Sequence, residues 1–245
     1  MTKHQKWFQS WFDTPYYHIL YKQRDQAEAQ DFIKNLVAHL GINQTQSILD
    51  LACGKGRHSI FLNALGFHVK GVDLSKKSIA EASKSANKRL QFAVHDMRVP
   101  LESKFDVVLN LFTSFGYFDT LEDNYRVLET IKSALSKDGI GVIDFMNSPF
   151  VIQHLVPSNS IYIDGIHFEI KRNFSDGVIT KSITVNDGDS VEHYNERVRA
   201  FNLNDFLDML SAVNLNFVEC FGNYSLEPYN AKTSKRLILM FKNNA

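Results

Sequence analysis

The 245-residue sequence has no excess of charge of either sign, because 27 Lys and Arg residues balance 27 Asp and Glu residues. Proteins that bind nucleic acid or anionic membranes usually carry a basic patch or a strongly positive net charge. We therefore expect neither nucleic acid nor a membrane among the partners of this protein.

Cysteine is also scarce, with only Cys53 and Cys220 in the chain. Two cysteines cannot build a disulfide framework, and Cys53 lies inside a glycine-containing turn, so reduced thiols are expected. No apolar run approaches the length of a membrane span, and the N-terminal stretch lacks the apolar core of a signal peptide. These absences predict a soluble, cytoplasmic protein.

The hydrophobic content of 44% and the aromatic content of 12% allow a large core in one domain with an elaboration. Through residue 146, hydrophobic runs typical of buried strands alternate with helical periodicity. Strands are expected at 47–51, 68–72, 90–97, 105–112 and 139–146, and helices at 25–40, 58–65, 76–89 and 123–135. A helix at 203–213 and strands at 216–225 and 236–242 follow later. The pattern predicts an α/β fold with a doubly wound, Rossmann-like, seven-stranded and mostly parallel sheet.

The rhythm changes after Met146. The segments "HFEIKRNF" and "VITKSITV" alternate with a period of two around an "SDG" hairpin turn, and "VEHYNERVRAF" continues the alternation. We therefore expect an antiparallel β insertion over 147–201, which either roofs the substrate site or pairs two subunits in a homodimer. The remaining parts are a helical lead-in or lid over 1–45 and a core formed by 46–146 and 202–245.

A glycine-containing turn follows the first strand in "SILDLACGKGRHSIFLNALGFHVKGVDLS". Gly54 and Gly56 leave the backbone bare at the carboxyl end of the strand, which is where ligands bind in open parallel sheets. Asp73 closes the second strand and is suitably placed to accept the hydroxyl groups of a ribose. Two ligands fit this pattern, a nicotinamide or flavin dinucleotide and S-adenosylmethionine.

The spacing favours S-adenosylmethionine. A dinucleotide fingerprint places a third small residue for close packing beneath the pyrophosphate, whereas here Ser59 stands at that position and bulky residues precede it. S-adenosylmethionine has no phosphate and needs acidic groups near its ammonium, ribose and adenine. Asp50, Asp73 and Asp96 follow one another at the ends of the first three strands.

The segments "ILDLACGKGRHSIFLNALGFHVKGVDLSKKSI", "VHDMRVP" and "FDVVLNLFTSFGYF" resemble the motifs of class I S-adenosylmethionine-dependent methyltransferases. The late insertion and the lead-in "YYHILYKQR" resemble small-molecule N-methyltransferases. The resemblance implies a methyltransferase that uses S-adenosyl-L-methionine and acts on the amine or hydroxyl of a small-molecule acceptor. It also implies cofactor contacts from Asp50, Ala52, Gly54, Gly56, Asp73, Leu74, Asp96, Met97 and Leu111. In the lead-in it implies a contact from Arg24 and one from either Tyr17 or Tyr21.

The acceptor site is expected beyond the fourth strand, where aromatic residues gather. Phe112 and Tyr117 are predicted to line it, because aromatic faces attract a sulfonium or amine. Arg197 in the insertion is a third candidate, suited to an anionic acceptor. The N-terminal aromatic residues Trp7, Phe8, Trp11 and Phe12 have helical spacing and fit either a packed stripe or a lid over the site.

Other interpretations remain open at this stage. Asp50 can act by capping the turn, and Cys53 is better explained as a small turn residue than as a nucleophile. No metal site is expected, since His95 and Asp96 lack further ligands at suitable spacing, and no residue is nominated as catalytic. The alternative functions are an NAD-dependent oxidoreductase and a non-catalytic or tellurite-resistance-like protein that binds S-adenosylmethionine. Nucleobase amino-methylation is disfavoured, because the fourth strand is followed by "NLFT".

Overall fold

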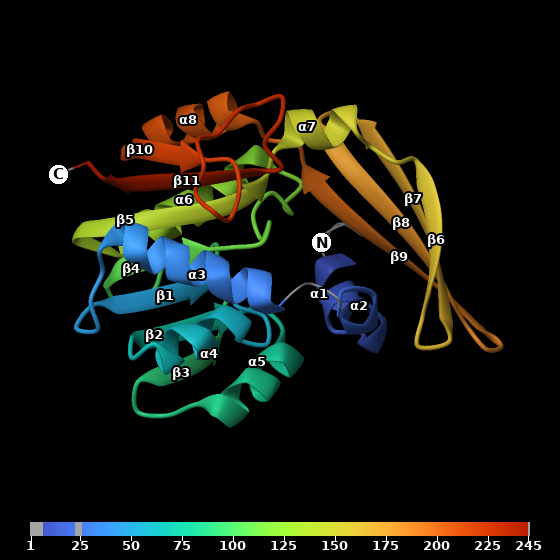
Figure 1. Ribbon diagram of the computed structural model, residues 1–245, viewed down its shortest axis with the longest axis horizontal. Helices are drawn as coiled ribbons and strands as arrows, with labels where there is room; N and C mark the ends of the chain where they lie inside the picture. The colour runs from blue at the N-terminus through green and yellow to red at the C-terminus, as the bar shows by residue number, and fades with distance from the viewer. Residues whose placement is uncertain (1–6, 23–25, 245) are drawn as a thin grey trace.

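The computed structural model describes residues 7–22 and 26–244 and has a seven-stranded sheet at its centre (Figure 1). The strand order is β10-β11-β5-β4-β1-β2-β3, with β11 antiparallel to both neighbours and β1 to β5 paired in parallel. The predicted doubly wound α/β fold is therefore confirmed. The strands are β1 Ser47–Leu51, β2 His68–Asp73, β3 Leu90–Val94, β4 Phe105–Asn110, β5 Leu135–Met146, β10 Leu215–Phe221 and β11 Arg236–Asn243.

Helices cover both faces of this sheet. One apolar cluster joins α3 and α4 to the sheet, and a second joins α6 and α8 to its other face. Alternate side chains of a strand point to opposite faces, so Ile48 enters the first cluster and Leu49 the second. The helices are α3 Gln26–Leu40, α4 Arg57–Ala64, α5 Lys76–Ala82, α6 Leu121–Ala134, α7 Ser148–Gln153 and α8 Leu203–Ala212.

The ends of the helices follow from local hydrogen bonding. Ser75 caps α5 as predicted, because its hydroxyl accepts a hydrogen bond from the Ser78 N–H at 2.9 Å. The predicted helix over 76–89 was too long. It stops at Ala82, and only a 3-10 turn continues over Ser83–Ser85, because Ser and Asn side chains compete with helical hydrogen bonding.

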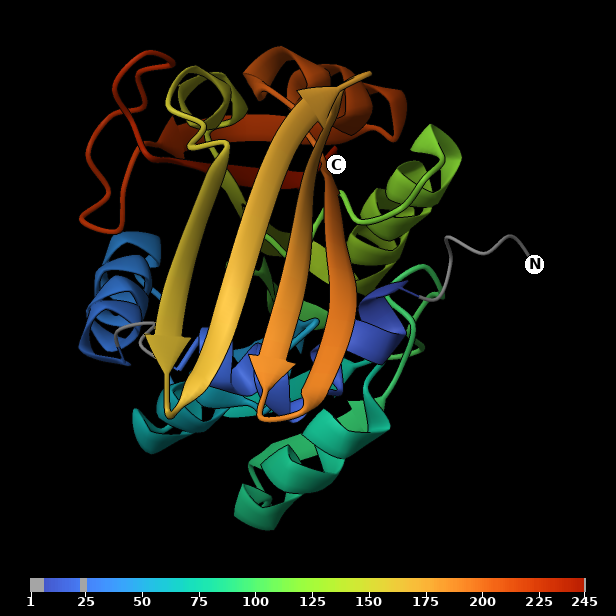
Figure 2. The ribbon, with the colours of Figure 1, turned by 90° about the vertical axis from the view of Figure 1, so that its right-hand side faces the viewer.

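The insertion forms a separate four-stranded antiparallel sheet in the order β6-β7-β8-β9 (Figure 2). The "SDG" segment forms the predicted hairpin turn, with Asp176 and Gly177 both at positive φ. The polar segment that becomes β6 and the short helix α7 were not predicted from the sequence. The strands are β6 Ser158–Ile163, β7 Ile166–Ser175, β8 Val178–Asp187 and β9 Ser190–Arg199.

Two N-terminal helices, α1 Trp7–Phe12 and α2 Pro15–Leu20, cover the apolar face of the second sheet. Trp11 is fully buried there, with its ring centroid 4.6 Å from that of Tyr194. Its Nε1 donates a 2.7 Å hydrogen bond to Glu196, and the Tyr21 hydroxyl donates another of 2.7 Å to the same carboxylate. The N-terminal helices thus lie between the second sheet and the strand ends of the central sheet (Figure 1). In the part of the chain that the structure describes, no helix is long and apolar enough to cross a membrane.

Candidate active site

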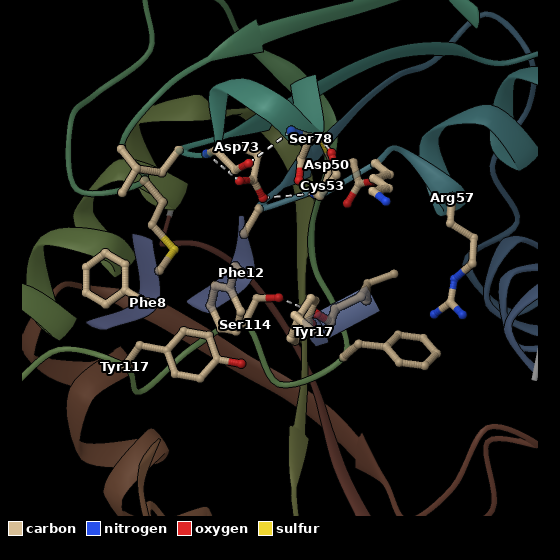
Figure 3. A pocket seen from close by; sticks show the side chains of 18 of the residues that line it. Phe8, Phe12, Tyr17, Asp50, Cys53, Arg57, Asp73, Ser78, Ser114 and Tyr117 are labelled. Atoms are coloured by element: carbon tan, nitrogen blue, oxygen red, sulfur yellow. Dashed lines mark hydrogen bonds between the residues drawn. The ribbon is translucent and has the colours of Figure 1, made fainter. Parts of the chain in front are cut away.

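A cavity of about 470 Å³ opens where the carboxyl ends of β1 to β4 face the N-terminal helices. Figure 3 shows Asp50 and Asp73 on one side of it and Phe12, Tyr17 and Tyr117 on the other. Most of the predicted site residues line this cavity, namely Tyr21, Asp50, Ala52, Gly54, Asp73, Leu74, Asp96, Met97, Leu111, Phe112 and Tyr117.

The two glycines of the turn serve different purposes. Gly54 has a φ of +56°, and a Cβ added there would meet no atom within 4 Å, so its backbone borders open space. Gly56 does not line the cavity. Its φ is +79°, and an added Cβ would lie 2.7 Å from the Phe92 ring, so glycine is needed there for close packing beneath the turn.

Asp50 is fully buried at the end of β1. The Ser59 hydroxyl donates a 2.5 Å hydrogen bond to Asp50 Oδ2. Burial raises the pKa of Asp50 to about 6 and outweighs the hydrogen bond from Ser59, while the nearby charge of Asp73 adds to the rise. The Asp50 carboxylate therefore forms part of the cavity wall, and Ser59 of α4 holds it in place.

Asp73 closes β2 and fixes the glycine turn. Its Oδ2 accepts a 2.9 Å hydrogen bond from Gly54 N, and its Oδ1 accepts one of 2.8 Å from Ser75 N. Burial raises its pKa, and these backbone N–H groups oppose the rise. Each carboxylate oxygen has two lone pairs, so both retain capacity for a ligand in the cavity.

Asp96 reaches the cavity already paired with Arg98, a residue that the sequence reasoning missed. Arg98 Nη2 lies 2.7 Å from Asp96 Oδ2, and Nε lies 3.1 Å from Oδ1. Partial burial acts to raise the pKa of Asp96, but the hydrogen bonds and charge of Arg98 outweigh it and lower the pKa. Arg98 also contacts Asp123 at 3.2 Å, which ties this wall to α6.

Aromatic rings form the wall after β4. Phe112 stacks on His58 with ring centroids 4.8 Å apart, and Arg57 lies 4.6 Å from the same ring. Burial and the charge of Arg57 lower the pKa of His58 to about 3, so this imidazole is neutral. Tyr117 packs edge-on against Trp7 at 5.6 Å, which joins the wall to α1.

The N-terminal helices supply part of the cavity wall. Phe8 and Phe12 of α1 line the cavity, as do Tyr17 and His18 of α2 and Lys22 just beyond it. Burial, followed by the charge of Lys55, lowers the pKa of His18. The signal for α2 was the "TP" pair that starts it, where Thr14 caps the helix by accepting from Tyr17 N.

Two of the predicted site residues that the structure describes, Gly56 and Arg197, do not line the cavity. Arg197 lies outside its lining, with Nη2 3.9 Å from Asp119 Oδ1. Strand alternation turns Glu196 toward the N-terminal helices and its neighbour Arg197 to the other face. Arg24 lies outside the described residues. Cys53 is buried in the turn, and burial raises the pKa of its thiol well above the usual range, which disfavours a nucleophilic role.

Comparison with known proteins assigns this architecture. Residues 48–139 match the family described as methyltransferase domain. A glycine/sarcosine N-methyltransferase of Aphanothece halophytica is 32% identical over 150 residues, covering 59% of this chain and 55% of the relative. A dTDP-3-amino-3,4,6-trideoxy-alpha-D-glucopyranose N,N-dimethyltransferase of Streptomyces venezuelae is 29% identical over 193 residues, covering 76% and 70%. The chain spans about half the length of the first curated relatives it matches.

The crystal structure of an S-adenosylmethionine-dependent methyltransferase from Clostridium acetobutylicum ATCC 824 has the same fold. Its TM-score is 0.80, and the alignment covers 94% of this chain and 96% of that chain at 21% identity. The domain matched in sequence contains β1, β2 and the glycine turn, and the shared fold extends over the second sheet. Residues 48–139 therefore match a methyltransferase domain, and the chain as a whole has the fold of the solved methyltransferase.

Proposed function

We propose that the protein transfers a methyl group from S-adenosylmethionine to the amine of a small-molecule acceptor. The observation that supports this most is the open corner formed by Gly54, Asp50 and Asp73. It combines a bare backbone with two carboxylates that line the cavity, and the oxygens of Asp73 keep lone pairs beyond their two backbone hydrogen bonds.

The residues present fit the cofactor. The cavity volume lies within the range of roughly 300–1,000 Å³ usual for small-molecule sites. In this proposal Asp73 accepts the ribose hydroxyls, Asp50 lies toward the ammonium group, and Leu74 and Met97 border the adenine. Asp96 would contact the adenine edge while it remains paired with Arg98. Bound S-adenosylmethionine would supply an electrophilic methyl group on its sulfonium.

An amine acceptor is favoured over a hydroxyl. Both relatives described above are named as N-methyltransferases, one of glycine or sarcosine and one of an amino sugar. A neutral amine needs no general base before it attacks, whereas a hydroxyl needs its proton removed. His58 is a poor base because its pKa is about 3, and Asp50 is engaged by Ser59.

The chain's own contribution is to position the acceptor and exclude water. Positioning alone contributes up to ~7–11 kcal/mol of a barrier of this kind. Tyr117, Phe12 and Ser114 project into the acceptor side of the cavity (Figure 3). We assign the N-terminal helices and the second sheet to a lid and roof over this side, because Glu196 joins both to one another. The proposal includes a cytoplasmic location, in keeping with two free thiols.

The test uses purified protein with S-adenosylmethionine carrying a labelled methyl group and a panel of glycine, sarcosine, amino sugars and matched hydroxy compounds. The proposal expects label to move to amines, with formation of S-adenosylhomocysteine. Labelling of hydroxy compounds alone contradicts the amine assignment. Binding of S-adenosylhomocysteine without transfer to any member of the panel favours a non-catalytic role.

A further inference from the structure

A buried ion pair supports the aromatic wall from behind. Asp144 in β5 is fully buried, and its Oδ1 accepts a 2.7 Å hydrogen bond from Nε of Arg236, the first residue of β11. Arg236 Nη2 lies 2.6 Å from the same oxygen. Neither residue lines the cavity, and both lie beyond the segment that matches the methyltransferase family.

The other oxygen of Asp144 holds the chain that follows β4. Oδ2 accepts a 2.9 Å hydrogen bond from Phe112 N, and the Asp144 carbonyl accepts one of 2.9 Å from Thr113 N. Arg236 Nη2 also donates to Thr113 Oγ1 at 3.0 Å. The pair thus contacts Phe112 and Thr113 through main chain and side chain alike.

Phe112 and Thr113 need such support. Their φ angles are +57° and +61°, the left-handed region that residues with a Cβ rarely adopt. Two successive non-glycine residues in this conformation persist only where surrounding contacts hold them. The Asp144 contacts are the hydrogen bonds that reach both backbone N–H groups.

The conformation of Phe112 decides the shape of the cavity wall. Its ring stacks with His58 at 4.8 Å and with Tyr224 at 5.3 Å, measured between ring centroids. Tyr224 is held in turn, since its hydroxyl donates to Asp144 Oδ2 at 3.3 Å. Asp144 therefore holds both Phe112 and Tyr224, one of the two rings that stack with Phe112.

We propose that Asp144, paired with Arg236, is a positioning residue that keeps Phe112 in place against His58 and so sets the wall of the methyl-transfer site. Its consequence for catalysis rests on the function proposed above, whereas the geometry itself can be measured without any ligand. Loss of the Asp144 carboxylate removes the hydrogen bond to Phe112 N and leaves only the Asp144 carbonyl on Thr113 N, so Phe112 relaxes toward negative φ and its ring moves away from His58.

The experiment follows the ring resonances of His58 by nuclear magnetic resonance as a function of pH, with His58→Gln used to identify them. Arg57 is the charged group that faces this imidazole. In the parent protein the resonances should not titrate above about pH 5, because the ring stays buried and neutral. In Asp144→Ala the midpoint should move upward toward the ordinary histidine value of about 6.5.

Asp106→Ala is the matched control. Asp106 lies near the start of β4, at the opposite end of this strand from Phe112. Like Asp144 it accepts hydrogen bonds from main chain and side chain, namely from Ser47 N at 2.8 Å and from Ser136 Oγ at 3.3 Å. It should leave the His58 midpoint unchanged. Adding Thr113→Gly to Asp144→Ala should return the midpoint part of the way, because glycine adopts positive φ without strain.

The proposal is overturned if folded Asp144→Ala leaves His58 as in the parent protein, if Asp106→Ala moves the midpoint equally, or if Thr113→Gly brings no return. Should Asp144→Ala fail to fold, Asp144→Leu carries the same test, since it keeps the approximate shape of the side chain but has no oxygen to accept from Phe112 N. Binding of S-adenosylhomocysteine is measured separately, so failure of the proposed function is distinguishable from failure of this inference.

Discussion

The hydroxyl of Ser59 lies 2.5 Å from Asp50 Oδ2, and both side chains are buried beneath the cavity. Ser59 stands where a dinucleotide fingerprint has its third small residue. Here that position holds a carboxylate at the end of β1 instead of making room for a pyrophosphate. The hydrogen bond between Ser59 and Asp50 is therefore one reason why we expect S-adenosylmethionine, and not a dinucleotide, in this cavity.

Asp50 should make stability depend on pH. Its pKa in the folded protein is about 6, above an unfolded value of about 3.9, so the folded state binds the proton more tightly. Protonated Asp50 stabilises the folded state by about 3 kcal/mol of unfolding free energy. This stabilisation is fully present below pH ~4 and is lost as the pH rises through about 6. Asp50→Asn should abolish this part of the fall in unfolding free energy, which urea unfolding measures between about pH 4 and pH 6. The control is Asp138→Asn, which changes an exposed aspartate near the start of β5. If stability declines with pH in Asp50→Asn as it does in the parent protein, the prediction is wrong.

Asp73→Asn should weaken binding of S-adenosylhomocysteine by ~1–3 kcal/mol, because charge-assisted hydrogen bonds to the ribose are lost. Asparagine keeps the size of the side chain, and its amide oxygen can still accept from Gly54 N or Ser75 N. Calorimetry at neutral pH measures the change, with Asp138→Asn as the matched variant. Equal affinities of Asp73→Asn and the parent protein rule out the ribose role.

Glu196→Ala should loosen the N-terminal helices from the second sheet. The change removes the hydrogen bonds from Trp11 and Tyr21 and leaves Lys181, 3.7 Å from Glu196, without this carboxylate. We expect a loss of ~1–3 kcal/mol in unfolding free energy and faster protease cleavage within α1 and α2.

Glu169→Ala is the control for Glu196→Ala, because strand alternation turns this exposed glutamate of β7 away from the face that packs on the N-terminal helices. Its Oε1 accepts a 3.3 Å hydrogen bond from Asn186 Nδ2 within the second sheet. It should change the unfolding free energy by less than about 0.5 kcal/mol. If both variants are cleaved at the same rate as the parent protein, Glu196 does not anchor the lid.

Tyr117→Phe separates packing from acceptor recognition. The ring contacts with Trp7 and Phe12, at 5.6 Å and 5.5 Å, remain in the variant, so its affinity for S-adenosylhomocysteine should be kept. If the hydroxyl contacts the acceptor, kcat/KM for the best amine of the panel should fall about fivefold, since one hydrogen bond is worth ~1 kcal/mol. A variant as active as the parent protein shows that the hydroxyl makes no contact with the acceptor.

The sequence predicted the parts of the site that depend on strand ends. Asp50, Gly54 and Asp73 come together because the carboxyl ends of neighbouring parallel strands meet at one edge of a sheet. Arg98 was missed because its pairing with Asp96 and Asp123 depends on the packing of α6, which no local pattern reveals. Arg197 was misjudged for a related reason. Alternation showed which residues share a face of β9, but not which face meets the N-terminal helices.

The support of the aromatic wall was equally hidden from the sequence. Asp144, Tyr224 and Arg236 are far apart along the chain, and they meet only because β11 pairs with β5 in an antiparallel register that sets Ile238 opposite Asp144. The left-handed conformation of Phe112 has no signature in "NLFTSFG", because neither it nor Thr113 is glycine. Such strained positions become visible only once their hydrogen-bond partners are known.

Calorimetric titration of the purified protein with S-adenosylhomocysteine and, in parallel, with NAD tests the central claim most directly. The open corner of Gly54, Asp50 and Asp73 predicts one molecule of S-adenosylhomocysteine bound per chain, much more tightly than NAD, with the difference reduced in Asp73→Asn. Tighter binding of NAD, or no binding of S-adenosylhomocysteine, would contradict the account.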